Sequence, residues 1–280
     1  MTDELDDPQA RQKRHREEEK GEEPQKGYET ILEQEILAGV TELERPARGL
    51  FLSGLSAGLD VSFSLLMIAI MEHLVEGRLP EPVARILVAN MYAVGFLFVV
   101  LGRSELFTEH TTLAVLPVLD RRASLARLGR LWTIVYAANL AGAAAFAAFV
   151  AFLAPPLRVA EPRTFGRIAG ELVSHPWWVI LLSGVLAGWL MGLLSWLVAA
   201  ARDTISQVFV VWLVTAAIGF AHLHHCIVGT AEVLAGVFSG LGATAGDYLY
   251  FLAFSTAGNA LGGIVFVALI KYGHARSQDG

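Results

Sequence analysis

The chain has 280 residues, of which 54% are hydrophobic, and it carries a formal net charge of −6. Several runs of 20 or more apolar residues exclude an ordinary soluble domain and indicate an all-α polytopic membrane protein. The single cysteine, Cys226, excludes an intrachain disulfide, and the acidic balance gives no reason to expect a nucleic-acid partner.

The ends of the chain are polar. Residues 1–30 are rich in glutamate and mixed in charge, which predicts a disordered acidic cytoplasmic tail, and residues 273–280 are expected to form a C-terminal tail. Within 31–48, apolar residues recur at helical spacing. This pattern predicts an amphipathic helix that either lies along the membrane interface or packs on the bundle.

Six spans are predicted in a transmembrane pore domain over 49–272, near residues 49–71, 85–119, 131–153, 177–200, 205–238 and 248–270. The loops on the side of the two termini carry nine arginines and lysines close to the spans, and the other side carries five. The positive-inside rule therefore places both termini in the cytoplasm, with the protein in the cell (inner) membrane.

Two of the spans are predicted to be broken. In the second, Arg103, Glu105 and Glu109 fall within seven residues, and each charge would cost about 2.5–3.5 kcal/mol at the centre of a lipid-facing helix. In the fifth, residues 219–229 place three histidines, a cysteine and two glycines inside an apolar run. Breaks are therefore expected at 102–110 and 219–229.

An internal repeat surrounds these breaks. The Leu-Ser-Gly and Ala-Gly pattern of residues 52–58 recurs at 182–188, and Asn139-Leu-Ala-Gly142 recurs as Asn259-Ala-Leu-Gly262. Each half contains three spans, an odd number, so the second half is expected to be inverted in the membrane. Inverted repeats with paired broken helices place the solute site at the interface between the repeats.

The broken segments carry a family resemblance. Glu105-Leu-Phe-Thr108 resembles a motif of the formate/nitrite transporter family, and His225-Cys-Ile-Val-Gly229 resembles its central histidine motif. The longer runs 105–117 and 227–233 resemble its divergent YfdC-like branch, and the similarity covers about residues 45–272. The resemblance implies an aquaporin-like protomer with its own pore, assembled as a homopentamer in the lipid bilayer.

His225 is the expected central residue, because imidazole can exchange a proton with a passing weak acid; the alternative is a core histidine satisfied by backbone carbonyls. Thr108 is expected to cap the second half-helix and offer its hydroxyl to the pore. The other expected pore residues are Leu106, Phe107, Phe220, Leu223 and Gly229. Phe107 has the alternative of packing between helices.

The expected pore-adjacent polar residues are Glu105, Glu109, Glu232, His222 and His224. Glu105 is expected to pair with Arg103. Ionised carboxylates along the path, including Asp60, would repel an anion, so the sequence leaves the charge of the solute open. Formate and nitrite carriers have Asn where Gly229 stands and a vestibule lysine, whereas no lysine lies between residues 27 and 270 here.

The sequence thus favours a passive or proton-linked channel or transporter, without enzymatic activity or a cofactor, for small monovalent anions or weak acids. One alternative is a pore for another neutral or cationic solute. A less favoured alternative is a membrane-embedded metal enzyme that uses the i, i+3, i+4 spacing of His222, His225 and Cys226; no metal site is expected. No P-loop and no Asn-Pro-Ala pair occur in the sequence.

Overall fold

A computed structural model describes residues 26–276, and this part of the chain is helical throughout, without strands. Most of the expected N-terminal tail, residues 1–25, and the last four residues lie outside the described range. The helices are α2 (Tyr28–Glu44), α3 (Ala47–Val61), α4 (Phe63–Val75), α5 (Glu81–Gly102), α6 (Phe107–Leu113), α7 (Leu116–Leu119), α8 (Leu125–Leu157), α9 (Pro162–Val173), α10 (Trp177–Ala200), α11 (Thr204–Phe220), α12 (Cys226–Phe238), α13 (Ala245–Leu261), the π-helix η1 (Gly262–Leu269) and α14 (Ile270–Arg276).

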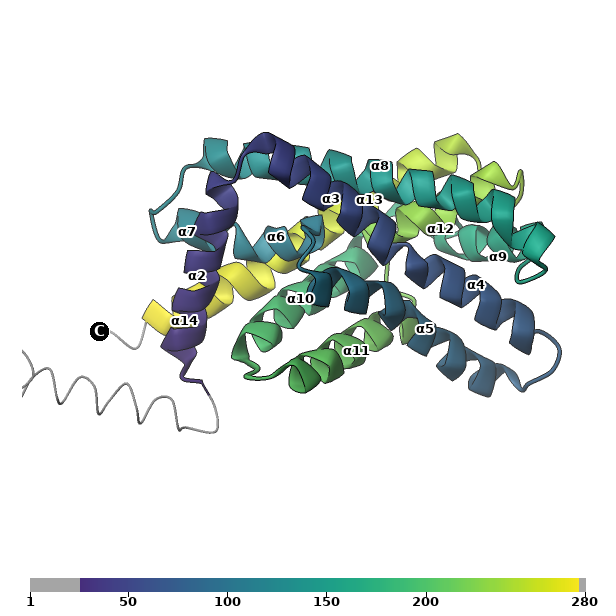
Figure 1. Ribbon diagram of the computed structural model, residues 1–280, viewed down its shortest axis with the longest axis horizontal. Coiled ribbons are helices and arrows are strands. Elements are labelled where there is room, and N and C mark those ends of the chain that lie inside the picture. The colour runs from purple at the N-terminus through teal and green to yellow at the C-terminus, as the bar shows by residue number, and fades with distance from the viewer. Residues whose placement is uncertain (1–25, 277–280) are drawn as a thin grey trace, which may run out of the picture.

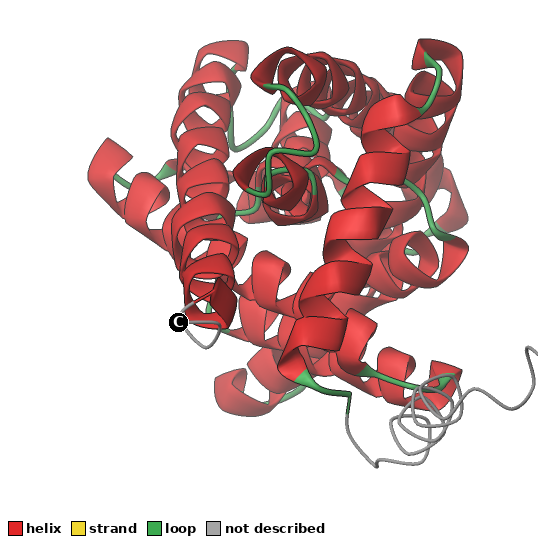
Figure 2. Cartoon of the chain, turned by 90° about the vertical axis from the view of Figure 1, so that its left-hand side faces the viewer, coloured by secondary structure: helices red, strands yellow, loops and turns green. Residues whose placement is uncertain are grey.

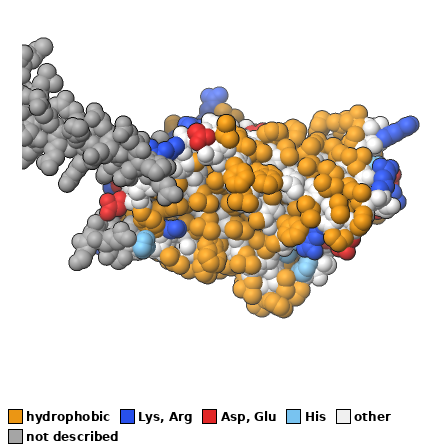
Figure 3. All heavy atoms as spheres, turned by 90° about the horizontal axis from the view of Figure 1, so that it is seen from below, with side chains coloured by type: hydrophobic (Ala, Val, Ile, Leu, Met, Phe, Trp, Pro, Cys, Tyr) orange, Lys and Arg blue, Asp and Glu red, His pale blue; other side chains and the backbone are white. Residues whose placement is uncertain are grey.

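Five helical stretches are long and apolar enough to cross a membrane: Ala47–Val75, Glu81–Gly102, Leu125–Leu157, Trp177–Ala200 and Ala245–His274. The shorter apolar helices α11 and α12 follow one another and together form the remaining span. Hydrophobic side chains cover most of the face seen in Figure 3, and charged side chains gather mainly towards its ends. The chain is therefore a multi-pass membrane protein, as predicted.

The first span contains an interruption that the sequence did not predict. Helix α3 ends at Val61, and α4 begins at Phe63. Ser62 lies between them, where its hydroxyl donates to the Gly58 carbonyl at 2.6 Å. A serine that bonds to the carbonyl four residues back is a known cause of a bend in a membrane helix.

The inverted repeat is confirmed by the order and packing of the helices. The first unit runs from α2 to α8, and the second runs from α9 to α14. Helix α9, which the sequence did not predict, takes the place of α2 (Figure 1). Helix α3 packs on α8, and α10 packs on α13. A Cβ at Gly58 would lie 2.2 Å from the Asn139 carbonyl oxygen, and one at Gly188 would lie 2.1 Å from that of Asn259. The repeated motifs are therefore close-packing sites.

Helix α2 lies across the end of the bundle at which the described termini meet (Figures 1 and 2). It buries Ile31, Leu32, Ile36 and Leu43 against that end. The helix begins at Tyr28, earlier than the expected 31, because the Tyr28 ring packs 4.7 Å from Trp196 and its hydroxyl donates to the Lys271 carbonyl at 2.9 Å.

Candidate functional site

The two breaks have the same backbone geometry. Helix α5 ends at Gly102 and is followed by Arg103 in the left-handed conformation, with φ 55°. Helix α11 ends at Phe220, and His222 occupies the equivalent left-handed position, with φ 49°. Such a residue closes the last turn of a helix and turns the chain away from the helix axis. The expected breaks at 102–110 and 219–229 are therefore confirmed.

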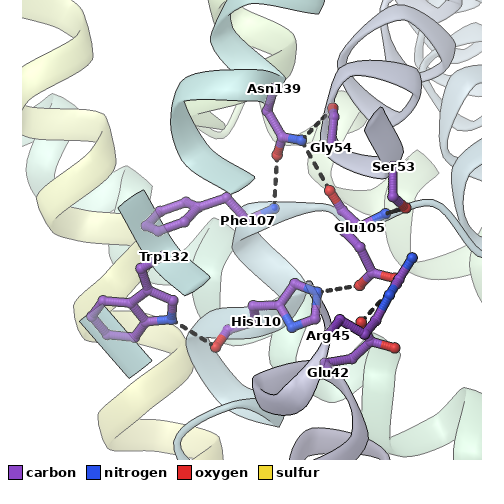
Figure 4. A network of polar contacts seen from close by, with 9 residues as sticks. All are labelled: Glu42, Arg45, Ser53, Gly54, Glu105, Phe107, His110, Trp132 and Asn139. Carbon is purple, nitrogen blue, oxygen red and sulfur yellow. Dashed lines mark hydrogen bonds and ion pairs between the residues drawn. The ribbon is translucent and has the colours of Figure 1, made fainter. Parts of the chain in front are cut away.

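A buried asparagine holds each break in place. Asn139 accepts a hydrogen bond from the Phe107 N–H at 2.8 Å and donates to the carbonyls of Gly54 at 2.7 Å and Glu105 at 2.9 Å (Figure 4). A single amide thereby satisfies two backbone groups at the break, the Phe107 N–H and the Glu105 carbonyl, and ties them to the carbonyl of Gly54 inside α3.

Asn259 makes the same three bonds in the second repeat. It accepts from the Cys226 N–H at 2.8 Å and donates to the carbonyls of Gly184 and His224, both at 2.9 Å. Both asparagines are fully buried. The two asparagines at repeated positions in the sequence thus hold the backbone of the two breaks in place.

His225 and Thr108 meet between the two half-helices. His225 Nε2 lies 2.9 Å from Thr108 Oγ1, and His225 Nδ1 accepts a hydrogen bond from the Val228 N–H at 3.2 Å. Because Nδ1 is an acceptor, the neutral ring carries its hydrogen on Nε2 and donates it to Thr108. The threonine hydroxyl hydrogen is then left to donate to a third group.

This geometry corrects one expectation. The N-cap residue of α6 is Leu106, and no side chain caps this helix. Thr108 therefore makes no cap hydrogen bond. The side chain that caps a half-helix is His225, at the start of α12. Because a proton added to Nδ1 would displace the Val228 N–H, the geometry favours a role for His225 as a hydrogen-bond donor to Thr108 over the expected role in proton exchange.

An aromatic pair that the sequence did not identify lies beside His225. Phe96 packs edge-on against the imidazole with centroids 5.3 Å apart, and Tyr92 stacks on Phe96 at 5.4 Å. Both aromatic side chains are at least 95% buried. They come from α5, the first half of the broken second span, and their spacing of four residues places them on one helix face. That spacing was the available sequence signal.

A cavity of about 400 Å³ lies beside Tyr92 of this pair and is lined in part by α4, α5 and α9. These helices extend to the end of the bundle opposite the described termini (Figure 1). The lining of the cavity includes Tyr92, Ile218, Leu223, His222 and Glu232. We call this cavity the outer vestibule, because it lies at the end of the bundle away from the described termini. His224, like His222 a histidine of the break, also lines the outer vestibule. The Ser183 Oγ atom lies 2.8 Å from His224 Nδ1, and the Leu172 carbonyl oxygen lies 3.1 Å from His224 Nε2. The broken fifth span therefore forms one wall of the vestibule.

A buried polar network lies on the other side of the first break (Figure 4). The Glu105 carboxylate contacts both Arg45 and the Nε2 atom of His110. The expected pairing of Glu105 with Arg103 is therefore wrong, because the left-handed turn at Arg103 separates the two side chains and α2 brings Arg45 to Glu105 instead. Arg45 also bonds Glu42 at 2.7 Å, which raises the pKa of the guanidinium, whereas burial raises the pKa of Glu42.

Three hydrophobic residues of the expected pore differ in their surroundings. Leu106 is fully buried at the first break, and Phe107 packs between Trp132 and Tyr136, with centroids 6.0 and 4.7 Å away. Phe220 is 49% exposed, and the Arg85 guanidinium lies 5.5 Å from its ring.

Two of the acidic residues differ in their partners. Asp60 accepts hydrogen bonds from Ser56 at 2.9 Å and Ser104 at 3.4 Å. Glu109 is half-buried on α6, where the described part of the chain provides no hydrogen bond or ion pair for its carboxyl group.

Gly229 is a packing position in this structure. A Cβ there would lie 2.3 Å from the Phe251 ring, which is fully buried. We expect Gly229→Ala to lower the free energy of unfolding by about 1–3 kcal/mol, because overpacking displaces a ring that has no free space. The melting temperature of the detergent-solubilised protein measures this loss.

The control for this change is Gly129→Ala, where a Cβ meets no atom within 4 Å in the exposed start of α8. That variant should melt at or slightly above the wild-type temperature. Phe251→Leu should restore part of the stability of Gly229→Ala. A Gly229→Ala protein with wild-type melting and lost flux would instead place Gly229 in the conduction path.

The spacing of His222, His225 and Cys226 suggested a metal site only if the three residues lay on one continuous helix, and the break interrupts that helix. His222 ends the turn after α11, whereas Cys226 is the first residue of α12, so they do not share a helix face with His225. Among residues 26–276, no three His, Cys, Asp or Glu side chains lie close enough together to hold a metal ion.

Two half-helices that enter a membrane protein from opposite ends and meet at its centre define a pore-forming class of inverted-repeat fold. The family model described as formate/nitrite transporter matches residues 29–273. The chain belongs to this family, whose members are channels and transporters.

Known proteins resemble the chain over most of its length. The inner membrane protein YfdC of Escherichia coli (strain K12) is 30% identical over 244 residues, which cover 86% of this chain and 76% of that protein. A solved FNT family ion channel superposes with a TM-score of 0.76 at 20% identity, covering 88% of this chain and 98% of its own. A pentameric formate channel with formate bound superposes with a TM-score of 0.66 at 23% identity, covering 82% and 98%. The aquaporin-like fold is thereby confirmed.

Proposed function

We propose that the protein conducts small weak acids and their monovalent anions through a pore in each protomer. The observation that carries this proposal is the hydrogen bond between His225 and Thr108 where the two breaks meet. Since the imidazole donates to Thr108 Oγ1, the threonine hydroxyl is left to donate to the solute. A hydrogen-bond donor held in a dehydrated passage suits an anionic oxygen, and apolar constrictions on its path exclude bulk water.

The helix termini support the same preference. The first turns of α6 and α12 begin at the two breaks, next to Thr108 and His225. The N-terminal end of a helix carries partial positive charge, which favours negative charge beside it. The family description and the formate seen in one structural relative point to formate and nitrite as the solutes to test first.

Flux in liposomes tests the function. Purified protein in proteoliposomes should carry formate and nitrite at least tenfold faster than empty liposomes, with urea and ammonium as neutral and cationic comparisons. Selective ammonium or urea flux without weak-acid flux would contradict the proposal. The buried carboxylates would then indicate a pore for a neutral or cationic solute.

We further propose a homopentamer in the inner membrane with both termini in the cytoplasm. The distribution of arginine and lysine supports the orientation, and the assembly of the structural relative supports the pentamer. Native mass spectrometry in mild detergent should give five times the protomer mass. A monodisperse monomer would contradict the assembly.

A further inference from the structure

Glu232 is a buried carboxyl group that the proposed function does not use. It lies on α12, seven residues after His225, and is 7% exposed. Its remaining surface forms part of the outer vestibule. Within the described residues no donor or cation lies within hydrogen-bonding distance of its carboxyl group. Because its carboxyl group has no protein partner there and its remaining surface faces the vestibule, it is available to water and to a solute in that cavity.

The groups around the vestibule leave Glu232 without a counter-charge. The other ionisable side chains that face this space are Glu72, Arg85, Tyr92, Glu171, His175, His222 and His224. Two of them are occupied elsewhere, since Glu72 is paired with Arg167, and Arg85 donates to the Phe220 carbonyl at 3.2 Å. An ionised Glu232 would therefore have no cation beside it to compensate its charge.

Glu232 also lies ahead of the part of the path in which a charged solute would lose its hydration. Tyr92 and Ile218 line the vestibule, and the Tyr92–Phe96 pair lies between Tyr92's wall of the vestibule and His225. An anion that crosses this buried aromatic pair must give up its hydration, whereas the corresponding neutral acid gives up much less. A proton donor on the vestibule side of the pair is therefore in the right place to neutralise the solute.

We propose that Glu232 is the proton-exchange group of the pore; this inference rests on the proposed function. The carboxylic acid of Glu232 gives its proton to the solute anion, so that the Glu232 O–H bond breaks, the acid O–H bond forms and a Glu232 carboxylate remains. A hydronium ion in the vestibule then returns a proton to the carboxylate and leaves a water molecule. His225, whose Nδ1 caps α12, keeps its own hydrogen throughout.

Proteoliposomes with a trapped pH-sensitive dye test this assignment. Wild-type protein driven by an inward formate gradient should take up one proton with each formate. Glu232→Gln, which is nearly isosteric but cannot exchange a proton, should lower coupled uptake at least tenfold, and Glu232→Asp should retain a measurable part of it. The matched control is Glu81→Gln, an exposed carboxylate at the start of α5 that should leave uptake unchanged.

A second readout separates chemistry from structure. As the external pH falls and more formate is already protonated, the defect of Glu232→Gln should shrink, which a structural defect would not do. Wild-type proton-coupled uptake in Glu232→Gln, or a faster anion flux that reveals an ionised and repelling Glu232, overturns the inference. If the wild type itself carries no weak acid, the proposed function fails first, and this inference fails with it.

Discussion

Replacing His225 by asparagine should lower weak-acid flux at least tenfold while leaving the protein folded. Asparagine is among the preferred N-cap residues, so it can still bond the Val228 N–H and begin α12. It is too short to reach Thr108 Oγ1, which His225 Nε2 meets at 2.9 Å. The threonine hydroxyl would lose the donor that orients it towards the solute. Stopped-flow light scattering of proteoliposomes in a formate gradient measures the loss.

The comparison residue is His222. It is exposed and has a left-handed backbone, a conformation that asparagine tolerates, so His222→Asn should fold and lose much less flux. His225→Phe, which removes both the cap and the donor, should lose flux and also melt at a lower temperature. Wild-type flux in an assembled His225→Asn protein would remove the residue from the conduction path.

The largest loss of stability is expected from Asn139→Ala or Asn259→Ala. Each substitution leaves one backbone N–H and one carbonyl without partners at a buried break and removes the tie to the neighbouring helix α3 or α10. An unsatisfied buried group costs about 1–3 kcal/mol, so two of them remove a large part of the stability of an ordinary domain. We expect little folded protein from either variant in membrane extracts analysed by fluorescence-detected size exclusion.

Asn90→Ala is the control for the Asn139 and Asn259 variants. Asn90 also makes two hydrogen bonds, to the Ile86 carbonyl at 2.7 Å and from Trp212 Nε1 at 2.9 Å, but on the exposed surface. Its loss should lower stability by about 1 kcal/mol at most. Because the repeat is symmetric, the Asn139 and Asn259 variants should behave alike. A normal yield from either one would show that water or local relaxation can satisfy the break.

Membrane class, repeat and break positions were all predictable from the sequence because each depends on local composition. The apolar runs have the length that a bilayer requires, and charges or clustered histidines inside such a run cannot face lipid. The paired motifs at 52–58 and 182–188 were visible because close helix packing demands glycine at fixed spacing. Each of these signals can be recognised within a segment without knowing which other segments it contacts.

Contacts between distant segments were decided by the tertiary structure. The sequence paired Glu105 with its near neighbour Arg103, whereas the fold brings Arg45 and His110 to it. It also expected Thr108 to cap its own half-helix, although the hydroxyl lies against a histidine 117 residues away. Neither periodicity nor spacing specifies which surfaces of two inverted halves face one another. That choice depends on how the six spans pack, and it alone places Thr108 beside His225 and Glu232 in the wall of the vestibule.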